Sequence, residues 1–336
     1  MKIISIIGAR PQFVKAAPLS RALRQNHQEY LLHTGQHYDG NMSKIFFDDL
    51  EIPRPDLNLN VGSASHAAQT AEMMVGIEKA VVEERPDLVL LYGDTNSTVA
   101  AALAATKLHV PVAHVEAGLR SFNWDMPEEI NRIVTDRISQ FLFCPTQTAM
   151  ANLRTEGLAQ KSYLVGDVMV DALYHFSKIA QKKVDPLTKF GVREKSYSVA
   201  TIHRPANTDN PQHLKSILAA FRDSGEKIIF PVHPRTRQFL QQHGLTNSGK
   251  ENLILTEPLS YLEILLLEKS ARTLLTDSGG MQKEAYLWGT PCITLRDETE
   301  WVETVEQGWN VLVGADYDKI LTALRNFHPD TPRTFS

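Results

Sequence analysis

Short apolar runs alternate with helical patterns along almost the whole chain, and this alternation constrains the fold more than any other feature of the sequence. Uninterrupted β-branched runs separated by helices are typical of parallel strands that are covered on both faces. Twelve such runs are too many for one ordinary sheet, and a chain of 336 residues is long enough for two cores. The runs lie at residues 3–7, 30–33, 88–92, 112–115, 141–144, 163–165, 198–202, 228–232, 253–255, 273–275, 292–295 and 311–313.

The sequence therefore predicts an α/β fold with two similar domains that face each other across a cleft. We assign residues 1–166 to the first domain and residues 167–336 to the second, with the polar stretch 181–195 as the crossing. Domain interfaces and the carboxyl ends of parallel strands are both favoured positions for ligands, and here they should coincide. The clearest helical patterns lie at residues 98–108, 128–139, 212–222 and 281–287.

Two of the apolar runs end abruptly in a carboxylate. Asp94 follows the run at 88–92 after one glycine, and Glu116 directly follows the run at 112–115. The carboxyl ends of parallel strands meet at one edge of a sheet, so we expect both acids there. With Glu128 and Glu129 close behind, the pattern indicates an acid/base site that acts on a sugar or a similar polyol.

Each acid also has a structural interpretation. Asp94 could be the N-cap of the next helix, and one of Glu128 and Glu129 could complement the dipole of the helix that begins near Pro127. Glu116 resists such an interpretation because no clear helix start follows it.

Two further segments have the residues of an anion site. Gly8 ends the first run and a helix begins near Pro11, with exposed amides and with the charges of Arg10 and Lys15. In the second domain, Ser278-Gly279-Gly280 starts a helix after a strand and presents backbone amides to a diphosphate. Glu284, about one turn later, could accept hydrogen bonds from ribose hydroxyls. Solvated charges in the first segment and an ordinary helix cap in the second are the alternatives.

Histidines follow two strands of the second domain. His203 and Arg204 come after the run at 198–202, and His233 ends the next run. A lone histidine is more often structural than catalytic, but a His-Arg pair at a strand end is a reasonable candidate for binding or catalysis.

Composition excludes several classes of function. A net charge of −4 argues against binding to nucleic acid or to a membrane surface. Cys144 and Cys292 lie in separate apolar runs and are expected to be buried thiols. The amino-terminal segment reads as a strand rather than a signal peptide, so we expect a cytoplasmic protein. His33 and His37 have the spacing of metal ligands, but a turn separates them and no set of three ligands assembles, so we predict no metal.

With these residues laid out, the chain resembles the non-hydrolysing UDP-N-acetylglucosamine 2-epimerases. The similarity covers nearly the whole chain through the segments IIGARPQFVKAAP, HTGQHYDGNMS, YGDTNST, HVEAGLRSF, MPEEINR, VGDVMVDAL, TDSGGMQKEA and RDETEWVE. The resemblance implies two Rossmann-like domains in a GT-B-like arrangement with UDP in the cleft. It assigns catalytic positions to Asp94, Glu116, Glu128 and His203, and UDP-contacting positions to Arg10, Lys15, Ser278, Gly279 and Glu284.

The resemblance also implies partners and a chemistry. The substrate would be a UDP-sugar, a second UDP-sugar could bind as an activator near Gln36 and His37, and the protein would be a homodimer. The dinucleotide fingerprint G-x-G-x-x-G is absent. This absence favours elimination and re-addition of UDP through a 2-acetamidoglucal over oxidation by NAD, so we expect no cofactor.

Two departures from the family pattern bear on activity. The family has a glutamate in the segment after the histidine, where this chain has Ala206. Relatives also continue beyond the position of Ser336 into a helix that packs on the first domain, so we expect looser domain closure here.

Other functions fit parts of the same pattern. The segments RSFNWDMPEEINR and RDETEWVE also resemble those of epimerases of UDP-2,3-diacetamido-2,3-dideoxyglucuronate. A GT-B glycosyltransferase would share the UDP cleft, and a non-catalytic sugar-nucleotide-binding protein would share the fold.

Overall fold

The computed structural model describes residues 1–36, 51–245 and 251–333. Its contacts divide the chain into two compact units, Met1–His175 and a second unit from Phe176 onward. The division falls inside helix α7 (Val168–Lys183). The expected polar crossing at residues 181–195 is therefore wrong: that stretch contains the end of α7 and helix α8 (Pro186–Phe190), which belongs to the second unit.

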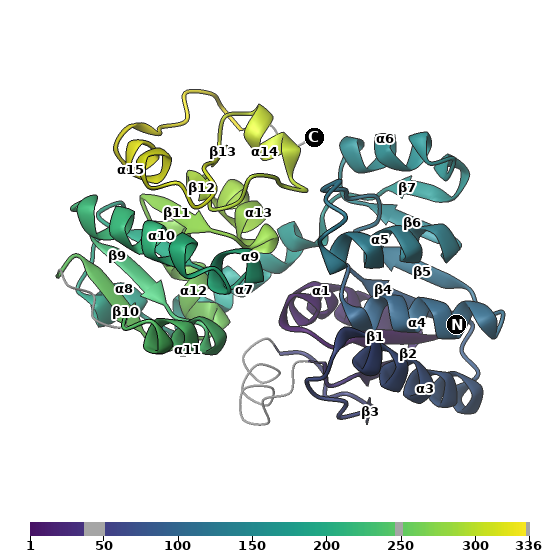
Figure 1. The fold of residues 1–336 in the computed structure, drawn as a ribbon. Helices are drawn as coiled ribbons and strands as arrows, with labels where there is room; N and C mark the ends of the chain where they lie inside the picture. Colours follow the sequence, from purple (N-terminus) through teal and green to yellow (C-terminus); the bar gives the residue numbers. More distant parts are fainter. Residues whose placement is uncertain (37–50, 246–250, 334–336) are drawn as a thin grey trace. The chain divides into compact units, whose positions relative to one another are not determined.

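The first unit is built on a seven-stranded sheet, as far as the structure describes it (Figure 1). Its strands are β1 (Lys2–Ile7), β2 (Gln28–His33), β3 (Leu57–Asn58), β4 (Leu88–Tyr92), β5 (Val112–Val115), β6 (Phe141–Cys144) and β7 (Ser162–Leu164). They follow the order β3-β2-β1-β4-β5-β6-β7, and the recorded pairings are all parallel. The helices of this unit are α1 (Arg10–Asn26), α3 (His66–Glu84), α4 (Asn96–Lys107), α5 (Pro127–Ile138), α6 (Gln147–Thr155) and the 3₁₀ turn η1 (Ala159–Lys161).

The second unit repeats this plan with six strands in its described part. They are β8 (Ser198–Thr201), β9 (Ile228–Pro231), β10 (Leu253–Thr256), β11 (Thr273–Thr276), β12 (Cys292–Thr294) and β13 (Asn310–Leu312), in the order β10-β9-β8-β11-β12-β13. Their recorded pairings are also parallel. The remaining helices are α9 (Pro205–Thr208), α10 (Pro211–Asp223), α11 (Pro234–Gln242), α12 (Tyr261–Ser270), α13 (Gly279–Trp288), α14 (Val302–Glu306) and α15 (Tyr317–Asn326).

Both faces of the second sheet are buried, as the apolar runs predicted. Ile228 and Phe230 pack into one hydrophobic cluster, whereas Ile229 between them packs into another. In the same way, Leu275 packs into the first of these clusters and Leu274 into the second. Successive side chains of a strand point to opposite faces, so a continuous apolar run is the pattern that a sheet covered on both sides requires.

Both sheets have the strand order of a Rossmann fold, which reverses its winding direction at one pair of neighbouring strands. In the first unit this pair is β1 and β4, with Ser5 opposite Leu90, and in the second it is β8 and β11, with Thr201 opposite Thr276. Loops after such strands diverge and leave room for a ligand. The expected Rossmann-like α/β architecture is confirmed within each unit.

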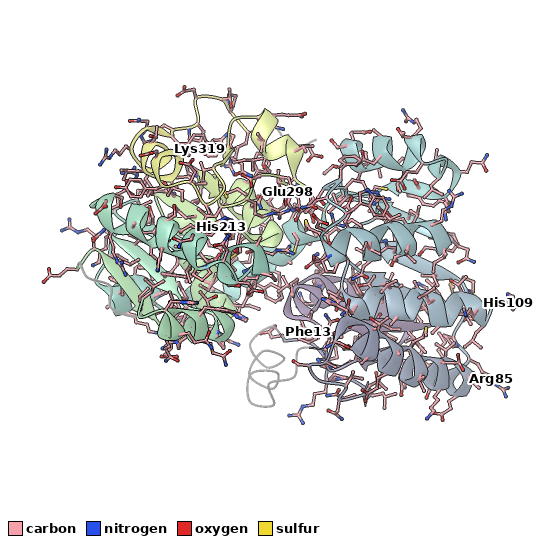
Figure 2. All side chains as sticks on the ribbon, viewed as in Figure 1. Phe13, Arg85, His109, His213, Glu298 and Lys319 are labelled. Atoms are coloured by element: carbon pink, nitrogen blue, oxygen red, sulfur yellow. The ribbon has the colours of Figure 1, made fainter. Side chains whose placement is uncertain are left out.

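The carboxyl edge of the first sheet lies opposite the turns that end its helices. Phe13 follows β1 and lies at one side of this unit, whereas Arg85 and His109 lie at the other side (Figure 2). Arg85 is the residue that ends α3, His109 follows the end of α4, and both have positive φ angles of 47° and 60°. The functional loops and these helix-ending turns therefore occupy opposite edges.

Most predicted strands agree with the structure to within one or two residues, and β4, β5 and β6 match at both ends. The strand β3 was missed because two residues are too short to form a pattern. Both cysteines are buried, and burial raises the pKa of each thiol to about 12. Within the three described ranges, no helix is long and apolar enough to cross a membrane.

The two faces of α3 allow a matched test of the core. Ile77 is fully buried in the cluster formed with the sheet, whereas Val82 on the same helix is 56% exposed. Ile77→Ala should lower the free energy of unfolding by about 2–5 kcal/mol because it leaves a cavity, and Val82→Ala should change it by less than about 0.5 kcal/mol. Urea unfolding of the full chain, followed by circular dichroism, measures both, and equal losses would contradict this packing.

Candidate active site

The side chain of Gln12 joins the two loops at the reversal point of the first sheet. Its amide oxygen accepts hydrogen bonds from the backbone amides of Gly8 (2.8 Å) and Ala9 (3.0 Å), and its NH2 group donates to the carbonyl of Tyr92 (2.8 Å). Gln12 thereby connects the amides of the two residues before α1 to the end of β4.

Lys15 in α1 forms an ion pair with Glu116, which directly follows β5, and both side chains are buried. Glu116 has a φ angle of +72°, a left-handed conformation that residues with side chains rarely adopt. Gly93 beside it has a φ angle of +62°, and a Cβ atom there would lie 3.2 Å from Oε2 of Glu116. The loops after β4 and β5 thus meet closely around this ion pair.

Asp94 forms an ion pair with Arg132 of α5 and is not the cap of the next helix, a position that Thr95 occupies. The backbone carbonyl of Asp94 accepts a hydrogen bond from Nδ2 of Asn131 (3.0 Å). Consecutive residues of α5 therefore hold both the carboxylate and the backbone of Asp94. The structural interpretation of Asp94 as an N-cap is wrong.

The alternative between Glu128 and Glu129 is decided by their surroundings. Glu129 is fully buried, pairs with Arg132 at 2.9 Å and accepts hydrogen bonds from the backbone amides of Ser121 and Phe122, both at 3.0 Å. Its two oxygens are therefore used in holding the loop before α5. Glu128 is half-buried in the same first turn, and it stays the candidate for catalysis.

Burial and neighbouring charge change the ionisation of the central pair. Burial raises the pKa of Glu116 above its ordinary value, and the carboxylates of Asp167 and Asp94 raise it further, against the effect of Lys15. Burial alone would lower the pKa of Lys15, but Glu116 and Asp94 raise it above its ordinary value. Glu116 and Lys15 therefore both have pKa values above their ordinary values. A carboxyl group with a raised pKa is suited to proton transfer.

In the second unit, Asp277 organises the loops after β8 and β11. This carboxylate is fully buried and accepts hydrogen bonds from the backbone amides of His203 (3.1 Å) and Arg204 (3.0 Å) and from Nδ2 of Asn207 (3.1 Å). Nδ1 of His203 lies 3.2 Å from the same group, and the His203 side chain is 39% exposed. A carboxylate at Nδ1 fixes the ring tautomer and stabilises the imidazolium form.

The helix start at Ser278 is formed as expected. Ser278 is the N-cap of α13, and its hydroxyl accepts a hydrogen bond from the amide of Met281. A Cβ atom on Gly279 would lie 1.8 Å from Oε1 of Glu300, so any other residue there would force the Glu300 side chain to move. Glu300 in turn lies 3.0 Å from Nη1 of Arg296.

The other expected binding residues lie around these loops. Glu284 is buried in α13 and accepts a hydrogen bond from the hydroxyl of Tyr261 (3.1 Å). The ring of His233, before α11, lies with its centroid 6.2 Å from that of His203. Arg10 is the first residue of α1, and Gly280 follows Gly279 in α13.

The structure thus brings the expected residues together within each unit. Asp94, Glu116 and Lys15 share a cluster in the first unit, and His203, Arg204, His233 and Ser278 follow neighbouring strands in the second. No group of three or more His, Cys, Asp or Glu residues in the described part of the chain could hold a metal ion.

Comparison with known proteins decides the family. A family model described as UDP-N-acetylglucosamine 2-epimerase matches residues 21–334. The chain belongs to the UDP-N-acetylglucosamine 2-epimerase family.

Several relatives are similar over nearly their full length. A UDP-N-acetylglucosamine 2-epimerase homolog of Methanococcus maripaludis is 54% identical over 98% of this chain and 93% of its own. The UDP-2,3-diacetamido-2,3-dideoxy-D-glucuronate 2-epimerase of Pseudomonas aeruginosa is 48% identical over 97% and 92%. The crystal structure of Methanocaldococcus jannaschii UDP-GlcNAc 2-epimerase in complex with UDP-GlcNAc and UDP superimposes with a TM-score of 0.94 at 44% identity, covering 100% of this chain and 96% of that one. This neighbour and others of the epimerase family confirm the expected GT-B-like fold class.

Three residues of this epimerase-family site were not predicted. Asp167 directly precedes α7, and its carboxylate accepts a hydrogen bond from the amide of Met169 (2.8 Å). It also raises the pKa of Glu116. Arg132 pairs with Asp94, and Asp277 holds the loop of His203. Asp167 and Asp277 both follow strands. The expectation that acids after parallel strands meet at one edge of the sheet, which identified Asp94, could therefore have found them as well. Arg132 gave no such signal because its partner depends on how α5 packs.

Two expectations concern residues near the edges of the described segments. His37 lies outside the described residues. Gln36 is described, and its side-chain oxygen accepts hydrogen bonds from the amide (3.0 Å) and hydroxyl (2.7 Å) of Ser97 in α4. Ala206 lies in α9, where its carbonyl lies 2.9 Å from Nδ1 of His213.

The environment of Glu116 can be tested without turnover. Its carboxyl group should titrate above its ordinary value of 4.5, and Asp167→Asn should move the titration to lower pH because a neighbouring negative charge is removed. Carboxyl ¹³C signals measure both values. Glu257→Gln, an exposed residue of the second unit, is the control and should leave them unchanged; a Glu116 titration unmoved by Asp167→Asn would contradict the cluster.

Proposed function

We propose that this chain inverts C2 of a UDP-2-acetamido sugar, converting UDP-GlcNAc to UDP-ManNAc, by elimination and re-addition of UDP. Membership of the epimerase family supports the reaction. The observation that carries the mechanism is the buried ion pair of Lys15 with Glu116 beside Asp94, at the carboxyl ends of β4 and β5.

The chemistry explains why an elimination suits such a site. The hydrogen on C2 has no adjacent carbonyl group, so its direct removal as a proton would leave an unstabilised carbanion. In the elimination, a base takes the proton from C2, the C–H electrons form the C1=C2 double bond, and the C1–O bond breaks to release UDP. Re-addition of UDP to C1, with proton delivery to the other face of C2, gives the inverted sugar.

Glu116 has the properties that the proton-transfer steps require. Its pKa is raised by burial and by neighbouring carboxylates, which makes its ionised form a stronger base than an exposed glutamate. Lys15 holds the carboxylate in place by its charge. Asp94, fixed by Arg132, and Glu128 in the next helix are the other acids available for returning the proton.

The second unit supplies donors for the departing UDP. The amides of Ser278, Gly279 and Gly280 at the start of α13 would bind the diphosphate, with Arg204 and His233 as further binding residues. Arg10 of the first unit also stays a proposed binding residue. Glu284 would accept from the ribose hydroxyls. His203, whose Nδ1 lies next to Asp277, is suited to stabilise the leaving group as an imidazolium. Lys15 remains a proposed UDP contact in addition to its ion pair with Glu116.

A second candidate substrate is UDP-2,3-diacetamido-2,3-dideoxyglucuronate. The relative in Pseudomonas aeruginosa that bears this name is 48% identical to the chain. The same elimination would apply, because this sugar differs at C3 and C6 and not at the reacting centre.

We further propose that the enzyme is a cytoplasmic homodimer and that a second UDP-sugar binds as an activator near Gln36 and His37. The resemblance of these segments to the family supports the proposal. The hydrogen bonds from Ser97 to Gln36 would connect such a site to α4, which follows Asp94.

The reaction is tested by following the C2 proton. In deuterium oxide without added NAD, we expect the C2 hydrogen of UDP-GlcNAc to exchange for deuterium as UDP-ManNAc forms, because the proton removed from C2 mixes with solvent. Parallel NMR time courses with UDP-GlcNAc and the diacetamido nucleotide identify the substrate. An active preparation that leaves C2 unlabelled with both would exclude the elimination.

The role of Glu116 is tested by substitution. Glu116→Gln should lower kcat by at least about 10²-fold, since general acid/base catalysis contributes that much. UDP affinity should stay within a few-fold, because the proposed diphosphate-binding amides lie in the second unit. Glu257→Gln serves as the control in the same assay. Unchanged turnover of Glu116→Gln would remove this residue from the mechanism.

A further inference from the structure

His114 is a fully buried histidine of β5 with two close polar partners. Its Nδ1 lies 2.7 Å from Oδ1 of Asp136, and its Nε2 lies 2.7 Å from the backbone carbonyl oxygen of Gly93. A carboxylate and a carbonyl only accept hydrogen bonds, so both ring nitrogens must donate. Each ring nitrogen of His114 thus has its own acceptor inside the first unit.

Asp136 of α5 connects this ring to the next turn of the chain. Its second oxygen accepts a hydrogen bond from the amide of Gly118 (3.1 Å) and lies 2.8 Å from Nη1 of Arg120. Burial alone would raise the pKa of Asp136, but His114 and Arg120 hold it below its ordinary value. Arg120 is anchored in turn by two hydrogen bonds to Glu156, at 2.7 and 2.8 Å.

The two ends of this network lie beside the two acids. The carbonyl of Gly93 is in the residue before Asp94, and the amide of Gly118 is two residues after Glu116. Gly93 also donates its amide to the carbonyl of Val115 (3.0 Å), so β5 holds both of its backbone groups. The turns that carry Asp94 and Glu116 are thereby fixed to one another.

The strain at Glu116 makes such anchoring necessary. A left-handed conformation at a residue with a side chain costs free energy and persists only when the surroundings impose it. The amides of Glu116 and Ala117 both donate to the carbonyl of Phe143, at 3.1 and 3.0 Å, and the hydrogen bond to Asp136 follows at Gly118.

We propose that His114 and Asp136 are positioning residues that set the geometry of Asp94 and Glu116 for proton transfer at C2. This inference rests on the proposed function. A buried ion pair contributes little net stability because desolvation offsets the attraction. Each printed side-chain contact of His114 and Asp136 outside the pair ends on a turn next to one of the acids or on Arg120, which precedes the loop held by Glu129.

The test compares kcat with UDP affinity in three variants. His114→Phe keeps an aromatic ring and removes both donors, so kcat should fall about 10²-fold, the scale of a 1 Å misplacement, with UDP affinity within threefold. Asp136→Asn allows the amide to donate to Nδ1 while its oxygen accepts from Gly118, so it should retain kcat within tenfold. Lys161→Met is the matched control: Lys161 donates to three carbonyls at the end of α5 but reaches neither acid-bearing turn, and kcat should stay within threefold.

Each result has a defined meaning. Wild-type kcat in His114→Phe, or an equal loss in Lys161→Met, would overturn the inference. If His114→Phe does not fold, Asp136→Ala replaces it, because it leaves the Gly118 amide without its acceptor, and the same split between kcat and UDP affinity is expected. ¹⁵N signals of His114 should show two protonated ring nitrogens in the wild type. A ring with only one protonated nitrogen would contradict the network. This measurement needs no turnover, so it tests the hydrogen-bond network independently of the reaction. A wild-type enzyme that exchanges no C2 proton would instead refute the proposed function.

Discussion

The reversal of winding direction in each sheet is the constraint on which the rest of the structure depends. It places β1 beside β4 and β8 beside β11, so that loops from distant parts of the sequence meet at one edge. Lys15 reaches Glu116 across a separation of 101 residues, and Asp277 reaches the His203 loop across 74. The chain needs no single long motif to assemble the acids, because the strand order brings them together.

Burial and neighbouring charges then set the ionisation of the residues at this edge. Burial raises the pKa of Glu116, and the neighbouring carboxylates of Asp167 and Asp94 raise it further against the effect of Lys15. Elsewhere in the first unit, Arg132 pairs with Asp94 and Glu129, and Arg120 pairs with Asp136. Positive charge is thus used to hold acids at fixed positions, a requirement for proton transfer at a weakly acidic carbon.

The sequence predicts the strands, the family and most of the site because strand periodicity and strand-end residues are local signals. Asp94, Glu116 and Ser278 were found in this way. The pairing of Lys15 with Glu116 was not, because it depends on how α1 turns over the sheet, and Lys15 was expected only to bind an anion. The role of Gln12, whose side-chain oxygen accepts from the backbone amides of Gly8 and Ala9 before α1, was missed for the same reason. Glu128 and Glu129 are adjacent in sequence, and only the structure shows that Glu128 is half-buried whereas Glu129 is fully buried and holds a loop.

The backbone of Glu116 has a consequence for how this protein can be altered. Glycine adopts its left-handed conformation without penalty, and it would also remove a buried charge. Loss of the glutamate would relieve the backbone strain but leave the buried Lys15 without its ion-pair partner, so the two effects on stability oppose each other. A screen for thermal tolerance at this position would therefore report only their sum, and a simultaneous change of Lys15 would be needed to separate them.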